Sequence, residues 1–177
     1  YLTRHQFVTD ESNTQRPGSH GGGKIFYWLC SSISTVLFSS KTIGDDYHEP
    51  GLRLFGKSQL NWHQFEGKDR GYAGRGFFGI EDPNQTRNRS ISAWDEDTTD
   101  VLDDLHLDRD LKEGCGTTIL VVGFFEPDQD ETRPIPEICS TFVKEIRNTF
   151  WPALINGDLE VEVNAFDEGQ QVFNKST

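Results

Sequence analysis

Apolar runs alternate with polar, glycine-rich and acidic stretches along this chain of 177 residues. The segment "GTTILVVGFFE" is apolar throughout, which predicts a strand over residues 117–125 that is buried on both faces. β-Branched and aromatic residues predict a second strand over residues 34–39. Alternation of apolar and polar residues predicts two more strands, over residues 52–60 and 159–163.

Two segments are expected to be helical. A short helix is predicted over residues 24–32, where it begins directly after a run of glycines. A longer helix is predicted from Pro136, which suits a first turn, to Gly157, which suits a stop. The pair Trp151-Pro152 is expected to break or kink this helix. Apolar residues recur along it at helical spacing: Ile138, Phe142, Val143, Ile146 and Phe150.

The other segments are expected to be loops with short turns. Residues 1–17 are polar and typical of a mobile loop, and "GKDRGYAGRGFFGI" indicates a loop packed on the body that ends in a short apolar segment. Residues 81–113 are polar and acidic, and four apolar residues within them indicate one or two amphipathic turns: Val101, Leu102, Leu105 and Leu107. The order of these elements predicts a two-layer α/β protein with a single domain over residues 1–177.

Charge and composition narrow the classes of function. The net charge is −12, and because proteins that bind nucleic acid usually present a basic surface, direct binding of nucleic acid is not expected. No apolar run approaches the ~20 residues that a membrane helix needs. The three cysteines form no CxxC pair, so a zinc site is not expected and the pattern suits a reducing cytoplasm. The chain starts at Tyr1 and contains no Met, which favours a piece of a longer protein.

A glycine-rich loop is the most specific local motif. In "RPGSHGGGKIFYWLC", Gly18 is followed after four residues by Gly23 and Lys24, which is the spacing of a phosphate-binding P-loop. However, Ile25 stands where a P-loop has a Ser or Thr, and no apolar run precedes Gly18. A flexible glycine turn before a helix is the plain alternative. A lysine is disfavoured at a helix N-terminus unless an anion lies there, so the loop indicates a phosphate site without specifying its fold.

Five segments in their order carry a family resemblance: "GSHGGGK" with "SSISTVLFSS", "RLFGKSQL", "GYAGRGFFG", "GCGTTILVVGF" and "FVKEIRNTFWPALINGDLEVEV". Together they resemble the second half of a Bergerat-fold ATPase domain. That superfamily includes gyrase B, the heat-shock 90 chaperones, histidine kinases and the mismatch-repair protein MutL. The chain is most similar to a group of uncharacterised bacterial ATP-binding proteins of this superfamily, over about residues 15–165. The resemblance implies a mixed β-sheet with helices on one face.

The resemblance also implies site residues. It matches the glycine-rich ATP lid, whose backbone N–H groups wrap the phosphates, to Gly18, Ser19, His20, Gly21, Gly22, Gly23 and Lys24. Lys24 would offer its ammonium group to the γ-phosphate. Thr117 or Thr118 would match the superfamily's Gly-Thr position, where a hydroxyl supports the recognition of adenine. A structural role as good strand residues is the alternative for both threonines.

The sequence departs from the family pattern at one point. The helix whose Glu activates water and whose Asn holds Mg²⁺ does not precede Gly18, nor does the Asp-x-Gly-x-Gly stretch that reads adenine. Both are expected to lie upstream of Tyr1. The resemblance then implies a cytoplasmic ATPase that binds ATP with Mg²⁺, hydrolyses it with the upstream Glu, and switches a homodimer or a protein partner. Two other functions stay open, a non-catalytic scaffold whose acidic loop over residues 95–113 binds a basic partner and a P-loop NTPase.

Other candidate groups are weaker. His48, His63 and His106 show no metal-binding spacing and are expected at the surface. The acidic cluster is expected to be a solvated face, because it lacks the spacing of a calcium loop; it comprises Asp95, Glu96, Asp97, Asp100, Asp103 and Asp104. In "GRGFFG", Arg75 stands beside Phe77 and Phe78, which indicates either a stacking site for a base or two buried rings beside a solvated arginine.

Overall fold

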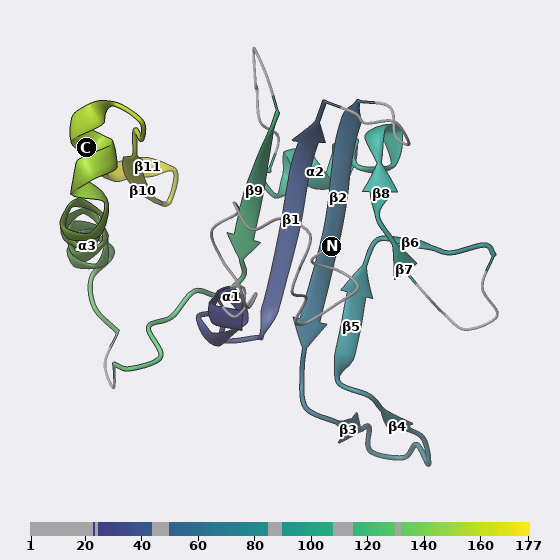
Figure 1. The fold of residues 1–177 in the computed structure, drawn as a ribbon. Coiled ribbons are helices and arrows are strands. Elements are labelled where there is room, and N and C mark those ends of the chain that lie inside the picture. The colour runs from purple at the N-terminus through teal and green to yellow at the C-terminus, as the bar shows by residue number, and fades with distance from the viewer. Residues whose placement is uncertain (1–22, 24, 44–49, 85–89, 108–114, 130–131) are drawn as a thin grey trace, which may run out of the picture. The chain divides into compact units, whose positions relative to one another are not determined.

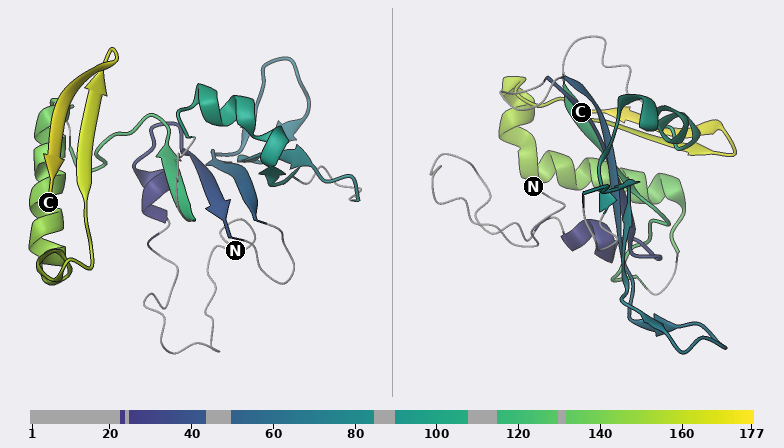
Figure 2. Two further views of the ribbon diagram at one scale, coloured as in Figure 1. Left: turned by 90° about the horizontal axis from the view of Figure 1, so that it is seen from above. Right: turned by 90° about the vertical axis from the view of Figure 1, so that its right-hand side faces the viewer.

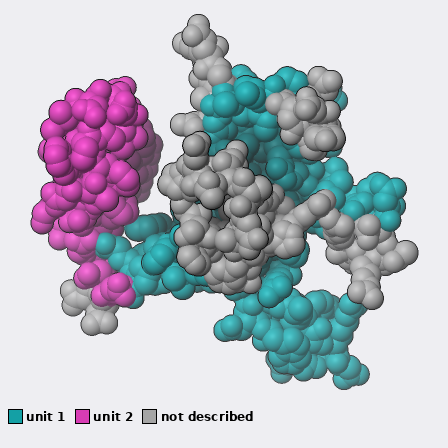
Figure 3. All heavy atoms as spheres, in the orientation of Figure 1, with its two compact units in different colours: residues 1–127 teal, residues 128–177 magenta. Residues whose placement is uncertain are grey.

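The computed structural model describes residues 23, 25–43, 50–84, 90–107, 115–129 and 132–177 (Figure 1). The chain divides into two compact units, Tyr1–Pro127 and Asp128–Thr177 (Figure 3). It is a strand-rich α/β protein, and every strand pair in the described residues is antiparallel. The mixed sheet expected from the family resemblance is therefore not found among the described strands. The prediction of one domain over residues 1–177 stays a prediction.

The first unit is built on a five-stranded sheet. Its order is β5-β2-β1-β9, and the short strand β8 also pairs with β2. These strands are β1 (Thr35–Thr42), β2 (Gly51–Gln59), β5 (Arg75–Phe78), β8 (Ala93–Trp94) and β9 (Gly116–Val121). The strands predicted over residues 34–39 and 52–60 are thus confirmed as β1 and β2, and β1 continues for three residues beyond its predicted end.

Two helices of this unit cover opposite faces of the sheet, as the left view of Figure 2 shows. Helix α1 (Ile25–Leu29) packs its Trp28 on Val36 and Phe38, while α2 (Thr99–Asp104) packs its Leu102 on Leu37. The expectation of helices on one face is therefore wrong for this unit. The reason lies in β1, whose consecutive apolar residues point alternately to both faces, so that each face needs a cover. We call these two sides of the sheet the α1 face and the α2 face.

The strand predicted over residues 117–125 is confirmed only in part. It ends at Val121, and its side chains are half-buried or exposed rather than buried on both faces. Among the described strands, β9 lies at the end of the sheet and pairs with β1 alone. The chain then turns at Gly123, whose φ of 62° lies in the left-handed region that favours glycine. Phe124 and Phe125 therefore follow the turn instead of extending the strand.

The glycine-rich segment that was expected to form a loop contains strands. It includes β4 (Gly71–Tyr72), β5 and the start of β6 (Ile80–Glu81), and β4 pairs with β3 (His63–Gln64) as a hairpin. A further short pair joins β6 to β7 (Ser90–Ile91). Cross-strand pairing overrides local propensity here, because the glycines let backbones approach closely: a Cβ on Gly74 would lie 1.7 Å from the carbonyl oxygen of Leu60.

The acidic segment folds around two buried leucines. A short 3-10 helix η2 (Asp95–Asp97) leads into α2, and Leu102 and Leu107 are buried against Leu37 and Leu54. The prediction of amphipathic turns in this segment is confirmed. The acidic side chains of the predicted cluster are exposed, as expected of a solvated face. One of them also has a structural role, because a carboxylate oxygen of Asp95 accepts a hydrogen bond from the backbone N–H of Leu52 at 2.9 Å.

The second unit consists of one helix and one hairpin. Helix α3 (Ile135–Asn156) packs against β10 (Glu162–Asp167) and β11 (Gln170–Ser176) (Figure 2). The strand predicted over residues 159–163 is thus shifted towards the C-terminus, and β11 was not predicted. The hairpin turns at Glu168 and Gly169, both with positive φ. No helix in the described part of the chain combines the length and apolar character needed to cross a membrane.

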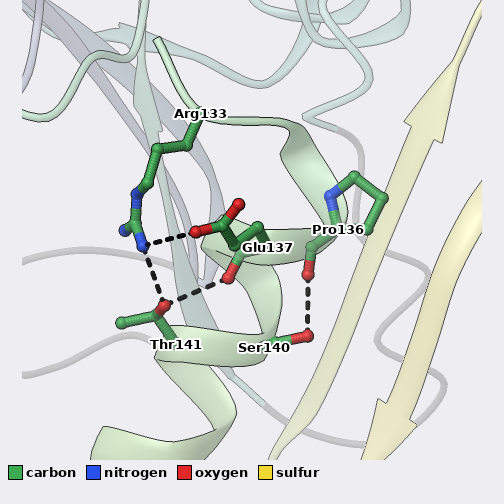
Figure 4. Close-up of polar contacts among 5 residues, drawn as sticks. All are labelled: Arg133, Pro136, Glu137, Ser140 and Thr141. Carbon is green, nitrogen blue, oxygen red and sulfur yellow. Dashed lines mark hydrogen bonds and ion pairs between the residues drawn. The ribbon is translucent and has the colours of Figure 1, made fainter. Parts of the chain in front are cut away.

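The first turns of α3 are held by side-chain contacts (Figure 4). A guanidinium nitrogen of Arg133 lies 3.5 Å from a carboxylate oxygen of Glu137 and donates a hydrogen bond to the hydroxyl of Thr141 at 3.2 Å. The Ser140 hydroxyl donates to the carbonyl of Pro136 at 2.8 Å. The predicted first turn at Pro136 is confirmed, and this turn also contains Glu137.

The helix end tests two predictions about α3. Gly157 ends the helix in the left-handed conformation, with φ of 76°, as predicted. The helix does not break at Trp151-Pro152, because α3 continues through Pro152 to Asn156, and the alternative of a kink there stays a prediction. A proline this close to the helix end removes one backbone hydrogen bond, while Ala153 and Leu154 in the last turn remain partly buried and keep that turn in place.

Candidate functional site

Helix α1, which follows the glycine loop in the sequence, packs on the α1 face of the sheet. Strand β1 places Val36, Phe38 and Ser40 on this face and Leu37 and Ser39 on the other, as the two separate core clusters show. The face divides along β1 into an aromatic half, covered by α1, and a polar half beyond it. The two halves offer different chemistry.

The aromatic half is organised around Trp28. Its ring centroid lies 5.9 Å from that of Phe38, and Tyr27 meets Phe38 edge-on at 6.4 Å. The indole N–H of Trp28 donates to the carbonyl of Lys57 at 2.9 Å, and the Lys57 ammonium nitrogen lies 5.5 Å from the centre of the indole ring. Trp28 is buried, so it fixes α1 on the sheet and holds a cation next to it.

The polar half is a row of side chains at one level of four neighbouring strands. The register pairs Thr117 of β9 with Ser40 of β1, Ser40 with Arg53 of β2, and Arg53 with Trp94 of β8. We call these four residues the cross-strand row. Directly opposite side chains in antiparallel strands lie about 5 Å apart and interact.

Side-chain contacts join the members of this row in two pairs. The hydroxyl oxygens of Ser40 and Thr117 lie 3.1 Å apart, a hydrogen-bond distance. The guanidinium carbon of Arg53 lies 5.6 Å from the centre of the Trp94 ring, and its Nε donates to the hydroxyl of the buried Ser92 at 2.8 Å. The guanidinium is therefore held in one orientation by a ring and a hydroxyl.

The two candidate threonines lie on opposite faces. Thr117 belongs to the α1 face through its contact with Ser40, whereas Thr118 pairs in register with Ser39 and so belongs to the α2 face. Thr117 is exposed and Thr118 is half-buried. Of the two, Thr117 shares a face with the helix that follows the glycine loop.

Most of the predicted lid falls outside the described residues: Gly18, Ser19, His20, Gly21, Gly22 and Lys24. Gly23 is described, is exposed, and stands two residues before the start of α1. Among the described residues, no atom lies within 4 Å of the place that a Cβ on Gly23 would take. Packing within the described part of the chain therefore does not explain why this position is a glycine.

The remaining candidates are located as follows. His106 is exposed, as expected, and His63 is half-buried on the β3–β4 hairpin; His48 lies outside the described residues. Phe77 and Phe78 are 46% and 48% exposed, so the interpretation of two buried rings beside a solvated Arg75 is wrong. They lie on β5, which pairs only with β2 among the described strands, and this leaves each ring half uncovered. Within the described ranges, no three His, Cys, Asp or Glu side chains gather as a metal site.

Sequence reasoning missed four members of this face: Ser40, Arg53, Lys57 and Trp94. A signal for two of them was present in "GLRLFGKS", where Arg53 and Lys57 alternate with apolar residues and so share one face of a strand. No local pattern indicates that Ser40 and Trp94 join them, since they come from strands distant in sequence.

Comparisons with known proteins assign neither a family nor a function to this chain. No protein-family model, no curated protein and no solved structure matches this chain.

Proposed function

We propose that this chain forms the glycine-lid part of an ATP-binding site of the Bergerat type, with the nucleotide on the α1 face. One observation carries the proposal: α1, which directly follows the glycine loop, packs on the same sheet face as Thr117. The superfamily resemblance requires the lid and the Gly-Thr hydroxyl to act on one ligand. The placement of α1 and Thr117 on one face supports that requirement, whereas Thr118 lies on the other face.

The chemistry of this face fits a nucleotide with phosphates. Arg53 and Lys57 supply two cationic groups, and Ser40 and Thr117 supply two hydroxyls that can donate and accept hydrogen bonds. Lys24 and the lid glycines would add an ammonium group and backbone N–H groups. Bound Mg²⁺ would neutralise phosphate charge, and its protein ligand is expected from the Asn of the upstream helix. Cleavage of ATP would require the upstream Glu as a base, so the proposal for this chain is ATP binding and lid closure.

The pairing of strands favours this proposal over a P-loop NTPase. A P-loop lies between a strand and a helix of a βαβ unit, in which the helix leads to a parallel strand. Here α1 has five residues and leads to β1, which is antiparallel to both of its neighbours.

A scaffold function remains the alternative from a different class, and one observation favours it. The side chains of η2 and α2 form an exposed acidic surface over the buried Leu102 and Leu107, which holds that surface in a fixed shape. Such a surface suits a basic protein segment. A scaffold would bind that segment in the absence of nucleotide.

The decisive experiment is calorimetric titration of the full protein that carries this chain with a non-hydrolysable ATP analogue and Mg²⁺. We expect micromolar binding that weakens by at least about tenfold, or roughly 1.4 kcal/mol, in Lys24→Ala. Thr117→Val should weaken binding by about fivefold, because it removes one hydroxyl on the α1 face. Thr118→Val is the matched control, since it makes the same change on the α2 face and should leave the affinity unchanged.

Two results would contradict the proposal. The first is absence of binding by the full protein. The second is an equal loss in both threonine variants, which would place the ligand elsewhere or show a general effect on the strand. Binding of a basic peptide that is lost in Asp100→Asn with Asp104→Asn, without any nucleotide binding, would establish the scaffold instead.

A further inference from the structure

A hairpin arm projects from the sheet between β2 and β5. It comprises residues 60–74, with the pair β3–β4 at its centre, and extends away from the five-stranded sheet (Figures 1 and 2). Its base is closed by a hydrogen bond of 2.7 Å from the N–H of Leu60 to the carbonyl of Gly74. The close approach of these two backbones, described above for Gly74, fixes the point at which the arm leaves the sheet.

Aromatic side chains cover both sides of this arm. On one side, His63 stacks on Tyr72 with ring centroids 5.8 Å apart and an interplanar angle of 16°, and Phe65 meets both rings edge-on. On the other side, Trp62 lies against Gly71, where a Cβ would come within 2.2 Å of the indole ring. The rings are therefore held by the ribbon and by each other rather than by a core.

These rings remain open to solvent. Trp62 is 66% exposed and Phe65 is 56% exposed. Large apolar side chains that gather at the surface usually mark a binding site. The arm thus presents rigid ring faces without burying them in the protein.

Cations accompany the rings. Lys68, Arg70 and Arg75 are exposed, and the guanidinium carbon of Arg70 lies 5.9 Å from the centre of the Tyr72 ring. From Gly51 to Phe78 the sequence contains five Lys or Arg and two Asp or Glu, a net charge of +3, whereas the whole chain carries −12. The excess of positive charge lies in the two flanking strands, because residues 60–74 of the arm itself hold two Lys or Arg and two Asp or Glu.

We propose that the arm binds single-stranded nucleic acid. Exposed rings interleaved with cations suit such a ligand, because every unpaired base offers a flat face for stacking and the phosphates between bases meet the cations. Trp62 and Phe65 would stack bases, while Lys68, Arg70 and Arg75 would contact phosphates. A duplex fits less well, since its bases are already stacked and paired.

This proposal changes the expectation drawn from net charge. The value of −12 is a sum over the whole chain and does not describe the arm. The surrounding negative charge should nevertheless keep the affinity low, because it repels the phosphates. Three phosphate contacts predict a slope of about −2 for the logarithm of the association constant against the logarithm of salt concentration.

The test is fluorescence anisotropy of labelled oligothymidine and oligouridine of about 12 nucleotides, without ATP, on the full protein. We expect saturable binding at low salt that Trp62→Ala weakens by about fivefold or more. Trp151→Ala is the matched control, because Trp151 is a similarly exposed tryptophan of the second unit, at 59%. Trp62→Phe keeps an aromatic ring against Gly71 and should lose less affinity than Trp62→Ala. Arg70→Gln should reduce the salt slope by about 0.7.

Several results would overturn the proposal. One is no change in anisotropy up to about 100 μM protein at low salt. Another is an equal loss of affinity in Trp62→Ala and Trp151→Ala while circular dichroism shows both variants folded. A third is self-association of the protein that Trp62→Ala abolishes, with no binding of either oligonucleotide. That outcome would assign the arm to contact with a second copy, whose acidic surface on η2 and α2 has the complementary charge.

Discussion

The two faces of the five-stranded sheet differ in what covers them. On the α2 face, aliphatic side chains from three strands and from the acidic segment form a buried cluster around Leu37, Leu54 and Leu102. On the α1 face, the aromatic cluster around Trp28 covers only one half, and the cross-strand row of hydroxyl, guanidinium and indole groups occupies the other. One face is therefore covered by aliphatic side chains, while the other combines an aromatic cluster with polar and charged groups.

The largest loss of stability should come from a substitution in the buried cluster of the α2 face. Leu102 is 2% exposed, so Leu102→Ala removes buried methyl groups and leaves a cavity in the cluster. We expect the free energy of unfolding to fall by about 2–5 kcal/mol. Urea unfolding followed by circular dichroism measures this change.

The neighbouring residue provides the control for that experiment. Val101 lies on the same helix but is 40% exposed, so Val101→Ala should cost less than about 1 kcal/mol. Similar losses in the two variants would mean that the α2 face is not the stabilising side of the sheet.

A smaller loss of stability is expected from a substitution of Trp28, through which α1 packs on the α1 face. Trp28→Phe keeps an aromatic ring but removes the indole N–H that donates to the Lys57 carbonyl, and it weakens the contact with the Lys57 ammonium. We expect a loss of about 1–2 kcal/mol in the free energy of unfolding. The same urea titration measures it. A loss as large as that of Leu102→Ala would show that both faces contribute equally to the stability of the sheet.

The smallest effect on stability should come from the cross-strand row. Ser40 is only half-buried, so Ser40→Ala removes its hydrogen bond with Thr117 at a cost within about 0.5 kcal/mol. The same variant should weaken binding of the ATP analogue, because Thr117 loses the hydroxyl that orients its own. Unfolding and calorimetric titrations of one preparation separate the two effects. Unchanged affinity together with a clear loss of stability would assign the row a structural role.

Local patterns in the sequence determined much of the framework. β-Branched and aromatic residues predicted β1, alternation of apolar and polar residues predicted β2, and helical spacing with Pro136 and Gly157 predicted both ends of α3. These features depend on near neighbours in the chain, through steric preferences, first-turn residues and the positive φ that glycine tolerates. The glycine loop, Lys24 and the Gly-Thr segment were likewise visible as motifs, although the lid itself lies outside the described residues.

Only the tertiary structure decided which of these residues lie side by side on one face of the sheet. The register of three strand pairings brings Thr117, Ser40, Arg53 and Trp94 into one row, and it puts Thr117 rather than Thr118 on the α1 face. A slip of one residue would move each of these side chains to the opposite face, and no local pattern sets that register. The arm shows the same limit. Residues 67–80, which include its second half, were predicted to form a loop packed on the body, whereas cross-strand pairing makes residues 60–74 a hairpin with exposed rings. Long-range pairing determines which groups meet, because the energy that selects it comes from residues far apart in the chain.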